Sequence, residues 1–124
     1  MEISSRQFAD VVVIAPLGRI DHSSARQLEE ALTPLWEKSG TDKESVVLDF
    51  VGVDYISSMG LRVLMIAAKE MRANDARIAI AALQPIVVEI FAISRFDRVL
   101  DVFPSVRSAL EQLSAPALEA FDLA

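Results

Sequence analysis

The sequence predicts an α/β domain with a mixed, largely parallel β-sheet of four to five strands, an antiparallel hairpin at the sheet edge, and about four α-helices. Short apolar runs rich in β-branched residues alternate along the chain with segments whose apolar residues recur at helical spacing. Only Ala9 and Asp10 separate the first two strand-like runs, which suits a tight antiparallel turn. With 124 residues, of which 52% are hydrophobic, the chain is long enough for one domain with one core.

The first half of the chain is predicted to contain the hairpin, a helix and a buried strand. Strands are expected at 3–8, 11–17 and 46–50, of which the last two are apolar runs that contain β-branched residues. The last of these is apolar almost throughout, as in a strand covered on both faces, so we place it at the centre of the sheet. A loop over 18–22 leads to Ser24 and Gln27, whose capping-box spacing predicts a helix that ends near 39–40.

The second half is predicted to continue the alternation. A short loop over 51–56 precedes a helix over 61–71, whose apolar stripe is so wide that most of the helix must be buried. Pro85 suits the first position of the following helix. The remaining elements, in order, are a strand, a helix, a short strand and a last helix, at 76–81, 85–94, 99–103 and 106–113.

Composition excludes several classes of function. The formal net charge is −6 and Lys and Arg form no cluster, which argues against a nucleic-acid partner. There is no cysteine and only one histidine, His22, so disulfides, thiolate catalysis and metal sites built on paired imidazoles are absent. No glycine-rich phosphate loop occurs. The apolar runs are too short for membrane insertion and no signal peptide precedes them, so we expect a cytoplasmic protein without a cofactor.

Two hydroxyls stand where the loop over 51–56 becomes a helix. Serine is a preferred N-cap because its side chain accepts a hydrogen bond from an unpaired N–H group of the first turn, and either Ser57 or Ser58 can do this. In the simpler interpretation, one serine caps the helix and the other lies beside it. In the other, one hydroxyl is modified, because a phosphate at a helix start meets unpaired N–H groups and the positive end of the helix dipole.

The segment Asp54-Tyr55-Ile56-Ser57-Ser58-Met59-Gly60-Leu61-Arg62-Val63-Leu64 resembles the signature of STAS domains, in particular the stand-alone anti-sigma factor antagonists of bacterial partner-switching systems. The resemblance covers roughly residues 5 to 113. It implies a STAS domain over 1–113 and a C-terminal tail over 114–124, whose apolar residues pack either on the domain or on a neighbouring molecule.

In that family, the serine two residues before the glycine is phosphorylated by a partner kinase that is also an anti-sigma factor. This position is Ser58, with Ser57 as the second choice. Family members often carry an aspartate just before the serine and a small residue after it, where this chain has Ser57 and Met59. Asp21 matches a second family position, an acidic residue beside the phosphorylated serine.

The resemblance therefore implies an antagonist that binds a kinase-type anti-sigma factor of the histidine-kinase-like ATPase fold when unphosphorylated and is released on phosphorylation. A serine phosphatase would act on the phosphorylated form, and the chain itself would be a monomer or weak dimer. We expect Gly60 to be constrained by close approach of backbone, either of the partner or of a neighbouring strand. The expected partner-binding residues are Asp21, His22, Ser57, Ser58, Met59, Gly60 and Arg62.

Two other functions compete with this one. A STAS scaffold also suits a constitutive adaptor subunit of a nucleotide-driven membrane transporter, in which the serine is only a cap. An enzyme is the weaker alternative, because no histidine or lysine is placed to activate Ser57 or Ser58. Asp21, Asp49 and Asp54 together could hold magnesium, but turn and cap carboxylates explain them better, so we expect no catalytic residue and no metal.

Overall fold

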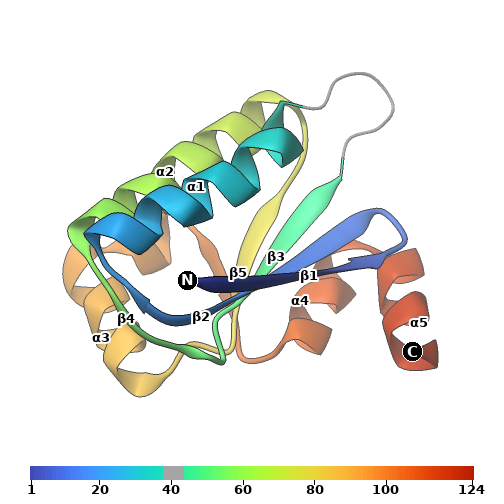
Figure 1. The fold of residues 1–124 in the computed structure, drawn as a ribbon. Coiled ribbons are helices and arrows are strands. Elements are labelled where there is room, and N and C mark those ends of the chain that lie inside the picture. Colours follow the sequence, from blue (N-terminus) through green and yellow to red (C-terminus); the bar gives the residue numbers. More distant parts are fainter. Residues whose placement is uncertain (38–43) are drawn as a thin grey trace.

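The computed structural model describes residues 1–37 and 44–124 (Figure 1). Within these residues, strands and helices alternate along most of the chain. The strands are β1 (Glu2–Phe8), β2 (Val11–Ile20), β3 (Ser45–Asp49), β4 (Val53–Ile56), β5 (Ile78–Ala81) and β6 (Asp101–Phe103). The α-helices are α1 (His22–Trp36), α2 (Ser58–Ala73), α3 (Pro85–Ser94), α4 (Val106–Leu113) and α5 (Ala115–Leu123), and a 3₁₀ turn spans Phe96–Arg98.

The sheet has the predicted mixed topology. Its strand order is β1-β2-β3-β5-β6, and β4 pairs with the far end of β2. The hairpin of β1 and β2 is antiparallel, with Phe8 opposite Val11, whereas every other pair is parallel. The strand β3 lies in the middle, as its short apolar run predicted.

Alternating side chains of the strands divide the core into two layers. Val12 and Ile14 of β2 pack in the cluster that includes residues of α1, α2 and α3, whereas Val11 and Val13 pack in the cluster beneath α4 and α5. Figure 1 shows the same arrangement, with α1 and α2 on one face of the sheet and α4 and α5 on the other. Because successive strand residues point to opposite faces, burial on both sides requires apolar residues at every position of the central strands.

Two segments predicted as loops are strands. Residues 18–20 continue β2 past the end of β3, and β4 forms within the predicted loop over 51–56 and pairs with them in parallel. Gly18 has a φ of 98°, a left-handed value that glycine adopts without strain, and the β2–β4 register shifts between Gly18 and Arg19. The extension carries the chain directly to the start of α1.

The start of α1 also differs from the prediction. Asp21, not Ser24, is the N-cap, and Ser24 occupies the third helical position of the capping box that was assigned to Gln27. The helix continues past Pro34 and ends at Trp36, which is half-buried and packs against the core. The predicted end near 39–40 lies outside the described residues.

The C-terminal tail forms a helix that packs on the body of the domain. The ring of Phe121 in α5 meets Phe8 of β1 edge-on, with 5.3 Å between centroids. Arg107 of α4 donates to both carboxylate oxygens of Asp122, from Nε at 3.1 Å and from Nη2 at 3.0 Å. The Ser114 hydroxyl accepts from the Ala117 N–H and donates to Asp10, which links the start of α5 to the β1–β2 turn. Of the two packing modes left open by the sequence, the structure therefore has the intramolecular one.

Candidate functional site

The parallel pairing of β2 and β4 brings two helix starts together. Ile20 and Ile56 are the last paired residues of these strands, and the helices α1 and α2 begin immediately beyond them. The Ser57 N–H donates to the Ile20 carbonyl oxygen at 2.8 Å, which fixes the two chain ends relative to each other. The N-caps Asp21 and Ser57 are therefore neighbours, although 36 positions separate them in the sequence.

Ser57 has a structural role as the N-cap of α2. Its backbone is extended, with φ −83° and ψ 171°, and its hydroxyl accepts from the Gly60 N–H at 3.2 Å. Its carbonyl oxygen accepts the first helical hydrogen bond, from the Leu61 N–H. These contacts satisfy orphan groups of the first turn, so the hydroxyl of Ser57 is engaged in the fold.

Ser58 differs from Ser57 in its position at the helix start and in the surroundings of its hydroxyl. It is the first residue of α2, it is exposed, and its hydroxyl forms no hydrogen bond within the described parts of the chain. The N-terminal turn around it carries unpaired N–H groups and the positive end of the α2 dipole. This hydroxyl is therefore accessible to a modifying enzyme, and an added anion would meet a favourable local field.

Asp21 holds the start of α1 and remains negatively charged. Its Oδ1 atom accepts from the N–H groups of Ser23 and Ser24, both at 3.1 Å, and from the hydroxyls of the same two serines. These hydrogen bonds, with the backbone bond from Ser24 the largest contribution, lower the pKa of Asp21 from 3.8 to about 2. The carboxylate is thus a fixed negative charge beside the start of α2.

Gly60 lets α2 lie close to the sheet. A Cβ atom at this position would stand 2.6 Å from Cγ1 of Ile56 and 2.8 Å from Cγ2 of Ile20. Within the protein the close approach is to side chains of β4 and β2, and not to the backbone of a neighbouring strand, which was one of the two possibilities expected from the sequence. Gly60 is also buried, so it shapes the surface by positioning the residues around it.

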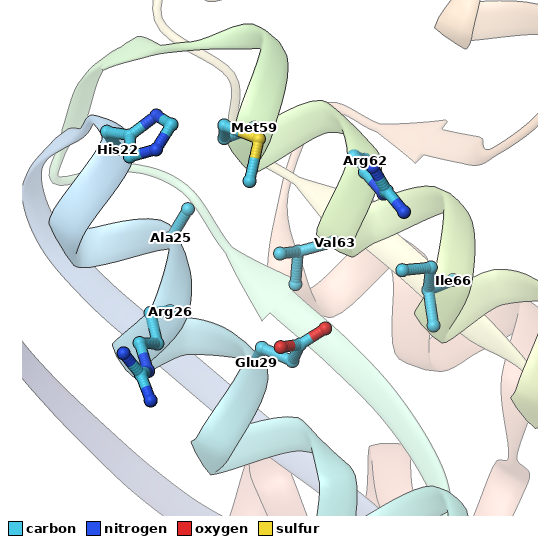
Figure 2. A pocket seen from close by; sticks show the side chains of 8 residues that line it. All are labelled: His22, Ala25, Arg26, Glu29, Met59, Arg62, Val63 and Ile66. Atoms are coloured by element: carbon cyan, nitrogen blue, oxygen red, sulfur yellow. The ribbon is translucent and has the colours of Figure 1, made fainter.

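A groove of about 450 Å³ runs between α1 and α2, starting at their N-termini. Figure 2 shows His22 and Met59 at one end of the groove, with Arg62 on α2 and Glu29 on α1 farther along it. Neither Arg62 nor Glu29 forms an ion pair within residues 1–37 and 44–124. The lining residues come from both helices: His22, Ala25, Arg26, Glu29, Met59, Arg62, Val63 and Ile66.

The expected binding residues thus gather in one region. Asp21, His22, Ser57, Ser58 and Met59 belong to the first turns or caps of the two helices, and Arg62 lies one turn farther along α2. The sequence did not single out Arg26, Glu29 or Ile66, although positions three and four residues along the same helix faces would have indicated them. Among the described residues, no three His, Asp or Glu side chains gather as a metal site.

Comparison with known proteins places this arrangement in a family. The family model described as the STAS domain matches residues 2–109. The chain belongs to the STAS domain family. Within the described residues of this chain, no helix is long and apolar enough to cross a membrane.

Individual STAS relatives agree with this assignment. The chain is 33% identical over 108 residues to a Bordetella bronchiseptica protein named "Putative anti-sigma factor antagonist BtrV", covering 87% of this chain and 88% of that protein. Its fold matches the crystal structure of an anti-sigma factor antagonist from Mycobacterium paratuberculosis with a TM-score of 0.79 at 20% identity, covering 90% and 92% of the two chains. It also matches the Bacillus cell fate determinant SpoIIAA in its phosphorylated form, with a TM-score of 0.68 at 15% identity and coverage of 90% and 98%.

Proposed function

We propose that this protein is an anti-sigma factor antagonist that binds a kinase-type anti-sigma factor while Ser58 is unmodified and is released when Ser58 is phosphorylated. The likeness to the Bordetella protein supports the first part. The observation that carries the second part is the contrast between two adjacent serines. Ser57 is committed to capping α2, whereas the hydroxyl of Ser58 is exposed and without a hydrogen bond in the described chain.

A phosphate on Ser58 is compatible with the fold. It would lie at the first turn of a 16-residue helix, where unpaired N–H groups and the helix dipole favour a negative charge. SpoIIAA, which shares this fold, has been solved in a phosphorylated form. The effect of the modification therefore falls on the bound partner rather than on the folded protein.

The docking surface is formed by the two helix starts and the groove between them. Met59, Val63 and Ile66 offer apolar contacts along one wall. Arg62 and Glu29, which form no ion pair within the described parts of the chain, offer charges for a partner. A partner that covers Ser58 removes water from the serine and from the neighbouring carboxylate of Asp21. A phosphate of about −1.5 to −2 charge in that space meets the Asp21 charge and loses hydration, so the complex is weakened.

The proposed partner is an anti-sigma factor of the histidine-kinase-like ATPase fold that phosphorylates Ser58, and a serine phosphatase regenerates the binding form. The antagonist itself has no catalytic role in this scheme. A constitutive transporter adaptor would need no modifiable hydroxyl. The Ser58 hydroxyl, which is exposed and has no hydrogen bond among the described residues, therefore favours the antagonist over the adaptor.

The test is phosphorylation by the candidate kinase of the same host with ATP, followed by peptide mass spectrometry. We expect modification at Ser58 in the wild-type protein and in Ser57→Ala, and none in Ser58→Ala. The Ser57→Ala variant is the matched control because it removes the neighbouring hydroxyl and leaves the proposed target in place. Modification confined to Ser57, or kinase binding that is equal before and after modification, would refute the proposal.

A further inference from the structure

A second cavity lies on the sheet face opposite α1 and α2. It encloses about 340 Å³ between the first three strands and the C-terminal helices, which falls at the lower end of the roughly 300–1,000 Å³ range of small-molecule clefts. Val13 and Ala15 of β2 line it from the sheet, and Phe121 of α5 lines it from the side of the C-terminal helix. Ser4, Arg6 and Asp49 are its polar residues.

Strand register explains how these polar groups surround an apolar floor. Ser4 lies directly opposite Ala15, and Arg6 lies directly opposite Val13. On the other side of β2, Ile14 pairs with Leu48 in parallel. The next residues of these two strands, Ala15 and Asp49, therefore lie side by side, in line with Ser4 across the sheet. The small side chain of Ala15 therefore separates the Ser4 hydroxyl from the Asp49 carboxylate, and leaves room above the sheet between them.

Within the described residues, neither of the two charged groups at this cavity, Arg6 and Asp49, forms an ion pair. The Arg6 guanidinium stacks on Phe8, 4.8 Å from the ring centroid, and forms no ion pair within the described residues. Asp49 uses Oδ1 to accept from the Val51 N–H at 3.1 Å, and its Oδ2 atom has no partner there. The exposed Ser4 and Arg6 and the half-buried Asp49 thus bring a hydroxyl, a cation and a carboxylate to the lining of a cavity whose other lining residues are apolar.

We propose that this cavity binds a small apolar zwitterion of the α-amino acid class. The ligand carboxylate accepts hydrogen bonds from Arg6, the ammonium group donates to Asp49 Oδ2 and the Ser4 hydroxyl, and the apolar side chain packs on Val13 and Phe121. A simple anion would face the Asp49 charge, and a simple cation would face Arg6. A neutral apolar molecule would desolvate both charges without pairing either, so a ligand with both charges fits best.

The site depends on a helix outside the matched domain. The STAS family model ends at residue 109, whereas α5 spans Ala115–Leu123 and supplies Phe121. The cavity also lies on the face away from Ser58 and shares no lining residue with the α1–α2 groove. The proposed ligand site is therefore separate from the docking surface, and one of its lining residues lies beyond the matched region.

The experiment is an NMR titration of the full chain, labelled with ¹⁵N, with L-phenylalanine and L-leucine as probes. We expect saturable shifts in β1 and α5 with a Kd of about 1 mM or tighter for at least one probe. N-acetyl-L-phenylalanine and L-phenylalaninamide, which each lack one charge, should bind about tenfold more weakly or worse. Arg6→Met and Asp49→Asn should each weaken binding of the intact probe by a similar factor.

Arg19→Met is the matched control, because Arg19 also stacks on an aromatic ring, 4.2 Å from the centroid of Tyr55, but does not line the cavity. It should leave binding unchanged. Asp49→Asn keeps an oxygen for the Val51 N–H, and the ligand derivatives test the same contacts on the unaltered chain. No saturable shift up to ~10 mM of either probe, or equal binding of the singly charged derivatives, would overturn the proposal.

Discussion

Ser57 and Ser58 are adjacent but have different tasks because one is the N-cap and the other is the first helical residue. Ser57→Ala removes the acceptor for the Gly60 N–H and should lower the free energy of unfolding by about 1 kcal/mol. Ser58→Ala should change it by less than about 0.5 kcal/mol. Ser58→Asp should leave the free energy of unfolding unchanged or raise it by roughly 0.3–1 kcal/mol, because a negative charge at a helix start interacts favourably with the helix dipole. Urea denaturation measures all three, and a clear loss in Ser58→Asp would show that the position is not tolerant of charge.

Asp21 should give the folded state a specific dependence on pH. Its pKa is about 2 in the folded protein against 3.8 ordinarily, so ionised Asp21 stabilises the fold above pH 3.8. This contribution is lost as the pH falls from that value toward about 2, because the folded state then takes up a proton with less affinity than the unfolded state. In Asp21→Asn, which retains a capping side chain, the free energy of unfolding should depend less on pH across this interval. Parallel slopes for the two proteins in urea denaturation would contradict the role assigned to Asp21.

Gly60 should resist the substitution that helix propensity favours. Replacing an unconstrained glycine within a helix by alanine stabilises the folded state by up to about 1 kcal/mol. Here the new methyl group would press on the branched side chains of Ile56 and Ile20, so we expect Gly60→Ala to destabilise the fold by about 1–3 kcal/mol. Thermal and urea denaturation, with Ser58→Ala of the same helix turn as control, measure the change. An increase in stability would show that α2 can shift without cost.

The elements predicted from sequence were those whose signals are local. The apolar run of β3, the amphipathic spacing of α2 and Pro85 at the start of α3 each carry enough information by themselves. The strand β4 was missed because four residues that include the polar Asp54 become a strand only through pairing with β2. The helix α5 was left as a tail because its packing depends on Phe8, more than a hundred positions earlier.

The same distinction applies to the candidate site. The motif around Ser58 is contiguous and was identified from sequence, and one of the two serines, Ser57 or Ser58, was expected to cap the helix. That Asp21 caps α1 was not predicted, because Ser24 and Gln27 offered a competing capping box nearby. The groove was not predicted either. Arg26 and Glu29 on α1 line the same groove as Arg62 on α2 only because the pairing of β2 with β4 places the two helices side by side.

The attachment of α5 should depend on its inward face. Phe121→Ala removes the ring that meets Phe8 edge-on, and the loss should be at least the ~0.5–1.5 kcal/mol of such an aromatic pair. Leu123→Ala in the same helix is the control, because Leu123 is 81% exposed and its truncation should cost less than about 0.5 kcal/mol. Urea denaturation of both variants provides the comparison. Equal stabilities would mean that α5 is not held to the domain in solution.

For the molecule as a whole, regulation requires a change at the surface without a change in fold. Both helix starts are fixed by their caps and by the hydrogen bond between Ser57 and Ile20, so a phosphate on Ser58 has a rigid position relative to Asp21. Unmodified and phosphorylated proteins should therefore have the same backbone. In the proposed scheme, the switch acts through the affinity of the partner for this one surface.

The size of that affinity change decides where the phosphate lies. Converting a mostly bound population into a mostly free one takes about 5.5 kcal/mol of differential affinity. An exposed charge at the rim of an interface contributes only about 0–1 kcal/mol and is screened by salt. The proposed switch therefore requires the phosphate to be buried near the centre of the interface, next to Met59 and the mouth of the α1–α2 groove.

The most direct measurement is the affinity of the kinase-type partner for unmodified protein and for protein carrying phosphoserine at position 58, each at low and high salt. The partner should be in a form that cannot transfer phosphate, so that both species remain unchanged during titration. We predict a loss of affinity of at least about a hundredfold, retained at high salt, because burial protects the repulsion and the desolvation cost from screening. A loss below about tenfold, or one that disappears at high salt, would contradict a central phosphate and with it this account of release.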